Sequence, residues 1–105
     1  MNTIITDWFF VTIMDKDQHI GDVIWGIVEE DNSYRFFKGD YVSTSRVVEI
    51  NYANRFAKTC SGSLYQLQGN GKKAIIDIDD FELLRSGFSP IQIRALNKVG
   101  SRFPH

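Results

Sequence analysis

Two apolar, β-forming runs separated by a short polar segment constrain the fold of this chain more than any other feature. WFFVTIM covers residues 8–14 and IGDVIWGIVE covers residues 20–29. Aromatic and β-branched residues favour strands, and the polar residues 15–18 between the runs indicate a turn. The second run has apolar residues on both faces, which is typical of a central strand or of a strand closed into a barrel.

Further strands are expected along the next fifty residues. The segment 41–52, YVSTSRVVEINY, alternates apolar and polar residues and predicts one half-buried strand with a wet face. The sequence Gly69-Asn70-Gly71 indicates a tight turn, after which residues 73–76 are expected to pair back as a short strand. The remaining predicted strands cover residues 34–37, 56–60 and 63–68.

The C-terminal quarter carries two helix start signals. Asp79 with Glu82 three residues later resembles a capping box, and Ser89 with Gln92 repeats the pattern around a proline at the first helical position. Gly87 lies where a helix commonly ends in a left-handed conformation. We therefore predict two short helices, at about residues 79–86 and 90–99.

Strands followed by helices indicate an α+β fold. We predict a curved antiparallel sheet of five to six strands, or a small open barrel, followed by two short C-terminal helices. With 105 residues and 43% hydrophobic residues, the chain fits a single domain covering residues 1–105. Residues 1–76 are expected to be mainly β, and residues 77–105 to form a helical tail packed on the sheet.

Composition indicates a cytoplasmic setting. The N-terminal MNTIITDWFF lacks a basic region and a small-residue cleavage site, so we expect no signal peptide. No apolar run approaches the roughly 18 residues of a membrane span. Cys60 is the single cysteine, so an internal disulfide is excluded, as suits a reducing compartment.

The chain shows no catalytic, metal or cofactor motif. A nucleophilic Cys60 would need a base, and the histidines are only His19 and His105. The glycines and lysines of residues 69–73 lack the Ser or Thr and the helix of a phosphate loop. The acids at residues 77–82 are explained by helix capping, so no metal site is predicted. These absences favour a protein that is not an enzyme and binds no cofactor.

Charge is unevenly distributed along the chain. Residues 1–31 contain seven acids and one base, whereas residues 32–105 contain eleven bases and six acids. Neutralisation between paired strands is one interpretation, and a basic face for an anionic partner is another. In the second interpretation, bases interleaved with aromatics would bind single-stranded nucleic acid. The candidate residues are Arg35, Lys38, Arg46, Arg55, Lys58, Lys72 and Lys73.

The segments FKGDYVSTSRVVEI and TCSGSLYQLQGNG, within residues 36–71, carry a resemblance. They resemble small, mostly uncharacterised bacterial proteins of about a hundred residues, some of them carried on integron gene cassettes or other mobile elements. The resemblance implies a bacterial cytoplasmic accessory protein and transfers no catalytic residue.

Together these features favour a small non-catalytic binding or regulatory module that acts through protein–protein contact. A homodimer is compatible with the sequence, because so small a domain can bury surplus aromatic and strand-edge surface against its own copy. Single-stranded nucleic-acid binding by the basic residues is one alternative. A small-ligand or thiol site around Cys60 is the other.

Overall fold

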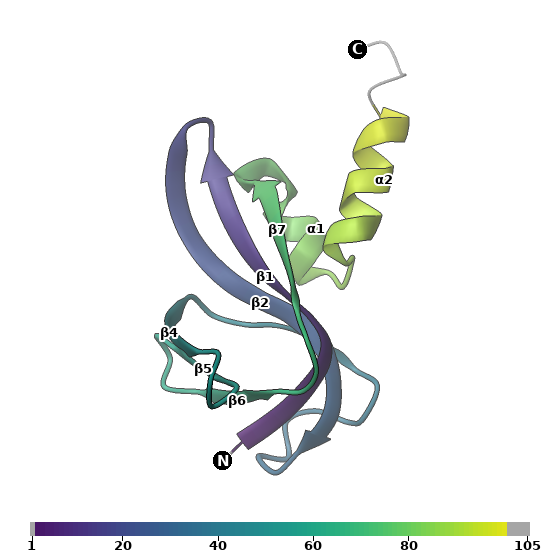
Figure 1. Ribbon diagram of the computed structural model, residues 1–105. Helices are drawn as coiled ribbons and strands as arrows, with labels where there is room; N and C mark the ends of the chain where they lie inside the picture. Colours follow the sequence, from purple (N-terminus) through teal and green to yellow (C-terminus); the bar gives the residue numbers. More distant parts are fainter. Residues whose placement is uncertain (1, 101–105) are drawn as a thin grey trace.

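Seven strands and two short helices make up residues 2–100, the part of the chain described by this computed structural model (Figure 1). The strands are β1 (Asn2–Asp15), β2 (Gln18–Asp31), β3 (Tyr41–Ser43), β4 (Val47–Asn51), β5 (Phe56–Thr59), β6 (Leu64–Leu67) and β7 (Lys72–Asp77). A short 3-10 turn, η1 (Ile78–Asp80), leads into α1 (Phe81–Arg85), and α2 (Pro90–Gly100) follows. The α+β class and the order of a sheet followed by two short helices are therefore confirmed.

The β1–β2 hairpin is the longest element of the fold. The two apolar runs form its central parts, and both strands extend beyond the predicted limits, to 14 residues each. The register between β1 and β2 shifts between Thr6 and Phe9, where Asp7 adopts a positive φ of 51°. Such an irregularity bends a strand and increases its twist. The hairpin accordingly curves along its whole length (Figure 1).

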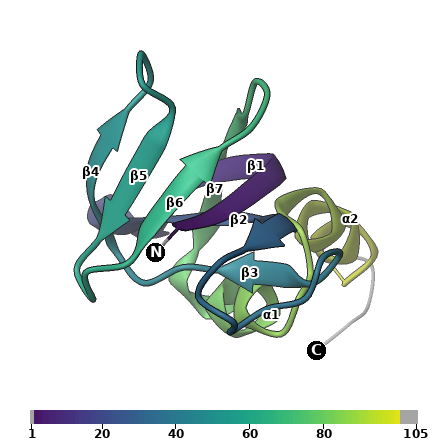
Figure 2. The same cartoon turned by 90° about the horizontal axis from the view of Figure 1, so that it is seen from below.

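Strand β1 is shared by two parallel pairings, so the sheet is mixed. Residues 2–5 of β1 pair with β6, and residues 9–14 pair with β7. The full order is β3-β2-β1-β6-β5-β4, with β7 paired to β1 off this path. The β4–β5–β6 meander and the helices lie on opposite sides of the hairpin (Figure 2). The predicted return of residues 73–76 onto the preceding strand is wrong, because the chain crosses from β6 to the other half of β1.

Two other strand predictions change for local reasons. The predicted strand 41–52 is interrupted after Ser43, where the Thr44 hydroxyl accepts a hydrogen bond from the Ile24 amide at 2.9 Å. Residues 34–37 form no strand, because the Asp31 carboxylate holds this segment as a loop. It accepts hydrogen bonds from the amides of Arg35 and Phe36, each at 2.7 Å.

Two apolar clusters lie along the hairpin and share both of its strands. One consists of buried residues under the meander: Ile5, Trp8, Ile24, Val28, Val42, Ala57, Tyr65 and Leu67. The other lies between the hairpin, β7 and the helices: Phe9, Val11, Ile13, Val23, Trp25, Ile76, Leu84 and Ile93. The second cluster fixes the helical tail on the sheet through residues 84 and 93.

The helix ends follow the sequence signals closely. Ser89 and Gln92 form a reciprocal capping box, with Gln92 N donating to Ser89 Oγ and Ser89 N donating to Gln92 Oε1. Gly87 has a φ of 112°, and the Phe88 amide donates to Leu83 O at 3.1 Å, as in a Schellman motif. The cap of the first turn lies two residues earlier than predicted, because Asp77 Oδ1 accepts from the Asp79 amide at 2.8 Å.

Gly71→Ala is expected to lower the free energy of unfolding by about 1–3 kcal/mol, the usual cost of overpacking. A Cβ on Gly71 would lie 2.4 Å from three atoms of the Trp8 indole, which is buried and donates from Nε1 to Gly69 O. Urea unfolding measures the loss. In a Trp8→Leu background the same substitution should cost clearly less. An equal cost in both backgrounds would show that the indole is not the obstacle.

No helix within residues 2–100 is both long enough and apolar enough to span a membrane. Residues 101–105 of the predicted helical tail lie outside the described part of the chain.

Candidate functional site

The outer edge of β7 is an open strand edge of the described sheet, as are those of β3 and β4, and it borders a groove along α2. Among the described strands, β7 is paired with β1 alone, so its other edge carries backbone groups without a strand partner. In a strand, alternate residues direct their N–H and C=O groups towards opposite neighbours. Every second residue of β7 therefore presents a donor and an acceptor to an incoming chain.

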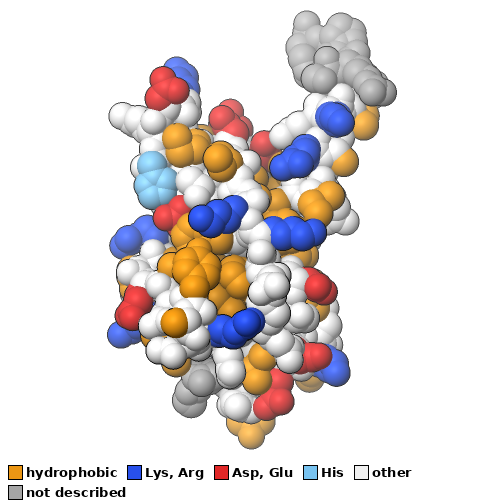
Figure 3. All heavy atoms as spheres, in the orientation of Figure 1, with side chains coloured by type: hydrophobic (Ala, Val, Ile, Leu, Met, Phe, Trp, Pro, Cys, Tyr) orange, Lys and Arg blue, Asp and Glu red, His pale blue; other side chains and the backbone are white. Residues whose placement is uncertain are grey.

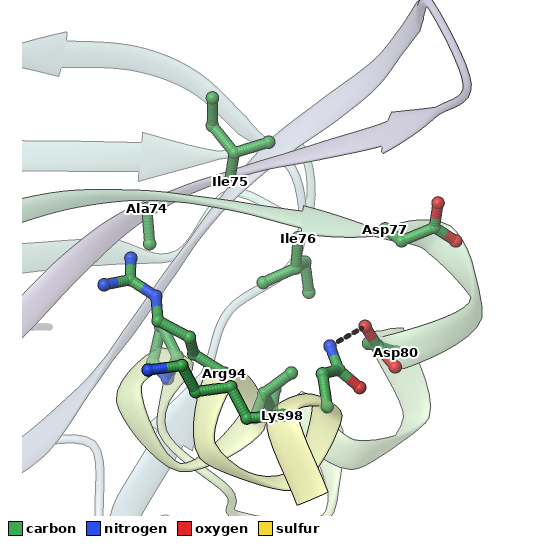
Figure 4. A pocket seen from close by; sticks show the side chains of 10 residues that line it. Ala74, Ile75, Ile76, Asp77, Asp80, Arg94 and Lys98 are labelled. Atoms are coloured by element: carbon green, nitrogen blue, oxygen red, sulfur yellow. Dashed lines mark hydrogen bonds between the residues drawn. The ribbon is translucent and has the colours of Figure 1, made fainter. Parts of the chain in front are cut away.

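The side chains of β7 alternate between a covered and an uncovered face. Ala74 and Ile76 point towards α2, whereas Ile75 points to the other side of the sheet (Figure 4). Ile76 is buried in the helical cluster, but Ile75 is 74% exposed. Lys73 and Asp77 share the side of Ile75, because side chains two residues apart lie on one face of a strand. Along the uncovered face of β7 the side chains are thus basic, apolar and acidic, in that order.

A groove of 390 Å³ separates β7 from α2. Its walls are the β7 segment 74–77 and Asp80 on one side, and residues of α2 on the other: Pro90, Ile93, Arg94, Asn97 and Lys98. Asn97 Nδ2 donates to Asp80 Oδ2 at 3.0 Å and joins the two walls at one end (Figure 4). The groove is therefore apolar at its base, basic along the helix and acidic where β7 ends.

Helix α2 stands beside the groove and is fixed mainly at its start. The capping box at Ser89 and the burial of Pro90 and Ile93 hold the first turns. The later turns diverge from the sheet (Figure 1) and carry the exposed apolar residues Leu96 and Val99. The helix therefore forms a wall of the groove without closing the edge of β7.

The seven basic residues named by the sequence lie in several places. Arg35 is in the loop after β2, where Nη1 donates to Ser63 Oγ at 3.4 Å. Arg55 Nη1 donates to Gly69 O at 3.2 Å, on a different hollow that Trp8 and Tyr52 also line.

The other five lie in the loops before β3 and before β4, on β5 and on β7. Lys38 forms an ion pair with Glu29 at 3.5 Å, and the stem of Arg46 lies against Gly21. Lys58 is exposed on β5, and Lys72 and Lys73 begin β7 on opposite faces. On the face seen in Figure 3, lysine and arginine side chains are spaced around apolar patches and do not form one stripe.

Cys60 is exposed in the turn after β5, and its amide donates to Arg46 O at 2.8 Å. His19 lies beside Asp22, at the far end of the β1–β2 hairpin, with its Nε2 3.0 Å from Asp22 Oδ1. The structure thus does not bring the described histidine to the thiol. Within residues 2–100, no three His, Cys, Asp or Glu side chains gather as they would to hold a metal ion.

Sequence reasoning named Lys72 and Lys73 but missed the edge to which they belong. The signal available was the period-two pattern Lys73-Ile75-Asp77, in which one face has a base, an apolar residue and an acid.

A scan against protein-family models, a search of curated proteins and a search of solved structures each found no match.

Proposed function

We propose that this protein is a small non-catalytic binding module that acts through protein–protein contact by adding a strand to the open edge of β7. The observation that carries the proposal is the one-sided pairing of β7. An open edge is a template for another extended chain, and main-chain hydrogen bonds supply much of the affinity in such complexes. The groove beside α2 leaves room for the side chains of the added strand on the covered face.

The chemistry of the edge selects a second copy of the same chain as its occupant. An antiparallel neighbour complementary to Lys73, Ile75 and Asp77 must present an acid, an apolar residue and a base in that order. Strand β7 read backwards, Asp77-Ile75-Lys73, has this pattern. Antiparallel pairing of two β7 strands about a two-fold axis at Ile75 places each Lys73 opposite Asp77 of the other copy.

The same pairing uses both faces of the strand. Residues directly opposite each other in an antiparallel pair lie on one face, so the two Ile75 side chains meet between the two ion pairs. On the groove side, Ala74 faces Ile76 of the other copy. Lysines on an edge strand commonly prevent pairing, and here Asp77 supplies the opposite charge that permits it.

The small energy of each ion pair and the small buried area favour a weak dimer that is sensitive to salt. An exposed ion pair contributes about 0.2–1 kcal/mol and is screened by salt. A single added strand also buries less area than a standard interface, which is typical of transient association.

Sedimentation equilibrium of two charge-reversed variants tests the pairing. In Lys73→Glu the introduced carboxylate faces Asp77 of the other copy, and in Asp77→Lys two ammonium groups face each other. Each variant alone is expected to be monomeric at concentrations where the wild-type protein dimerises. Mixed in equal amounts, the variants should form a heterodimer, because every facing pair then has opposite charges.

Lys58→Glu is the matched control, because it makes the same charge change on the exposed face of β5. It should leave the wild-type dimer intact. Since Asp77 also accepts the Asp79 amide, circular dichroism must first show that the Asp77→Lys variant is folded. A wild-type protein that stays monomeric at millimolar concentration and low salt contradicts the proposal, as does a mixture that fails to associate.

A further inference from the structure

A second hollow, of 380 Å³, lies between the loop after β2, strand β3, the turn after β5 and the end of α1. It shares no lining residue with the groove beside β7. Its lining residues are Arg35, Phe36, Tyr41, Val42, Ser43, Ser45, Ser61, Ser63, Tyr65 and Arg85. The volume is within the roughly 300–1,000 Å³ of small-molecule sites.

The lining is basic and rich in hydroxyl groups. It contains two arginines, four serines and two tyrosines, and no lining residue is a carboxylate. Guanidinium groups bind the oxygens of phosphate and sulfate through paired N–H donors, and serine hydroxyls add further donors. The hollow therefore has the composition of an oxyanion site.

Arg35 is positioned by hydrogen bonds that leave its charge without a carboxylate partner. Asp31 binds the Arg35 amide, and Arg35 Nε donates to Ser33 Oγ at 2.9 Å. The contacts of Nη1 with Ser63 Oγ and of Nη2 with Thr3 Oγ1 are long, at 3.4 and 3.5 Å. Within residues 2–100 Arg35 makes no direct ion pair, and the Asp31 carboxylate reaches its guanidinium only through the Ser33 and Thr3 hydroxyls.

Arg85 lines the hollow at the end of α1, and its guanidinium lies over the Phe81 ring, 5.8 Å from the ring centre. Tyr41 Oη donates to Arg85 O at 2.7 Å and ties this helix end to β3. The Arg85 guanidinium contacts Glu82 at 3.4 Å, in a pair in which both side chains are more than half exposed. Because exposed pairs of this kind contribute little, a ligand oxyanion can replace Glu82 at small cost.

Serines from two segments line the hollow, and their hydroxyl groups differ in accessibility. Ser43 Oγ has almost no accessible surface and makes no hydrogen bond within the described structure. A buried polar atom without a partner is unusual in a folded protein. On the other wall, Ser63, Ser61 and Thr59 form a chain of hydroxyls that begins at Arg35. The turn after β5 thus holds hydroxyl donors beside Arg35, whereas Ser43 Oγ is closed off from the hollow by neighbouring atoms.

We propose that this hollow binds the oxyanion of a small phosphate or sulfate ester, with Arg35 and Arg85 on the charged oxygens and the serine hydroxyls around them. The ester carbon skeleton lies against Phe36 and Tyr65. Arg35 already stacks on Phe36, with its guanidinium carbon 5.1 Å from the ring centre. The volume exceeds that of one inorganic phosphate, so an organic ester should bind more tightly than the free ion.

Titration of the full chain followed by amide NMR shifts tests this assignment, with inorganic phosphate, inorganic sulfate, ribose 5-phosphate and ribose as probes. Ribose 5-phosphate should bind most tightly, and ribose should not bind. Arg35→Gln and Arg85→Gln should each weaken ribose 5-phosphate binding about tenfold or more, as expected for a charged hydrogen bond.

Lys58→Gln removes a positive charge outside the hollow and should leave the affinity unchanged. Equal weakening by Lys58→Gln and Arg35→Gln would overturn the proposal, as would the absence of saturable shifts with every anion.

A short oligothymidylate without terminal phosphate tests whether the bound phosphate belongs to a small ester or to a nucleic-acid backbone. Tighter binding of this oligonucleotide at Arg35 and Arg85 would overturn the small-ester assignment in favour of a nucleic-acid backbone. The exposed Tyr34 and Phe37 in the same loop would then stack on bases.

Discussion

Leu84→Ala should lower the free energy of unfolding by about 2–5 kcal/mol, the range for truncating a buried leucine. Leu84 is fully buried in the cluster between the hairpin, β7 and the helices. Helix α1 has only five residues and no side-chain cap at its start. So short a helix is not stable alone, and its position depends on packing. Denaturant unfolding followed by circular dichroism gives the loss directly.

Leu96→Ala is the matched control for this prediction. It removes the same atoms from α2, where the side chain is 43% exposed. Leu96→Ala should lower the free energy of unfolding much less than Leu84→Ala does. The Leu96 side chain buries little apolar area, and its truncation leaves no cavity. Equal losses at the two positions would mean that α1 is not held by the buried cluster.

Asp31→Ala should cost about 3 kcal/mol at pH 7 and release the loop that carries Arg35. The carboxylate accepts hydrogen bonds from the Thr3 and Ser33 hydroxyls and from the amides of Ser33, Arg35 and Phe36. A single hydrogen bond to a charged group contributes about 1.5–3 kcal/mol, and several share this acceptor. The variant should therefore lose stability and ester binding together, measured by urea unfolding and by the ribose 5-phosphate titration.

The same carboxylate predicts a dependence on pH. Partial burial alone would raise the pKa of Asp31, but hydrogen bonds from Ser33, Thr3 and Phe36 outweigh it and hold that pKa well below its usual range. A lowered pKa in the folded state stabilises the protein above the unfolded value, about 3.9, and this contribution is lost as pH falls further. The stability difference between wild type and Asp31→Asn should thus be constant above about pH 5 and shrink below pH 4. A difference that stays constant down to pH 2 would contradict the role of the charge.

The helical tail could be read from the sequence because its signals are local. The Ser89–Gln92 box and the glycine at position 87 act within a few residues of themselves, and both are found in the structure. Strand positions were also predictable where β-forming residues run together, as in residues 8–14 and 20–29. The loop at residues 34–37 was missed because its order depends on one carboxylate, Asp31, that belongs to the preceding strand.

Strand partners were less accessible to sequence reasoning. Gly69 and Gly71 read as a hairpin turn, but the residues that follow pair with β1, some sixty positions earlier in the chain. A turn signal fixes where a chain bends and leaves open which strand it reaches. Here Gly71 lies so close to the Trp8 indole that a Cβ would overlap the ring, and no local pattern encodes this long-range constraint.

The candidate sites, like the strands, could be predicted from the sequence only in part. The sequence named Arg35, Lys72 and Lys73 as basic residues without locating their surroundings. Whether Lys73 faces a ligand or solvent depends on β7 being an edge, which is a property of the whole sheet. The serines of the second hollow come from two separate segments, residues 43–45 and 61–63, so only the fold brings them to Arg35 and Arg85.

The dual pairing of β1 has a consequence for the order in which the protein is made. A ribosome releases β1 and β2 early, and they can form their hairpin at once because their contacts are local. The parallel partners of β1 emerge only with residues 64–77. Until then the hairpin has an unpaired edge along β1, which is 14 residues long. Nascent chains arrested before residue 64 should therefore be the most prone to aggregation and the most dependent on chaperones.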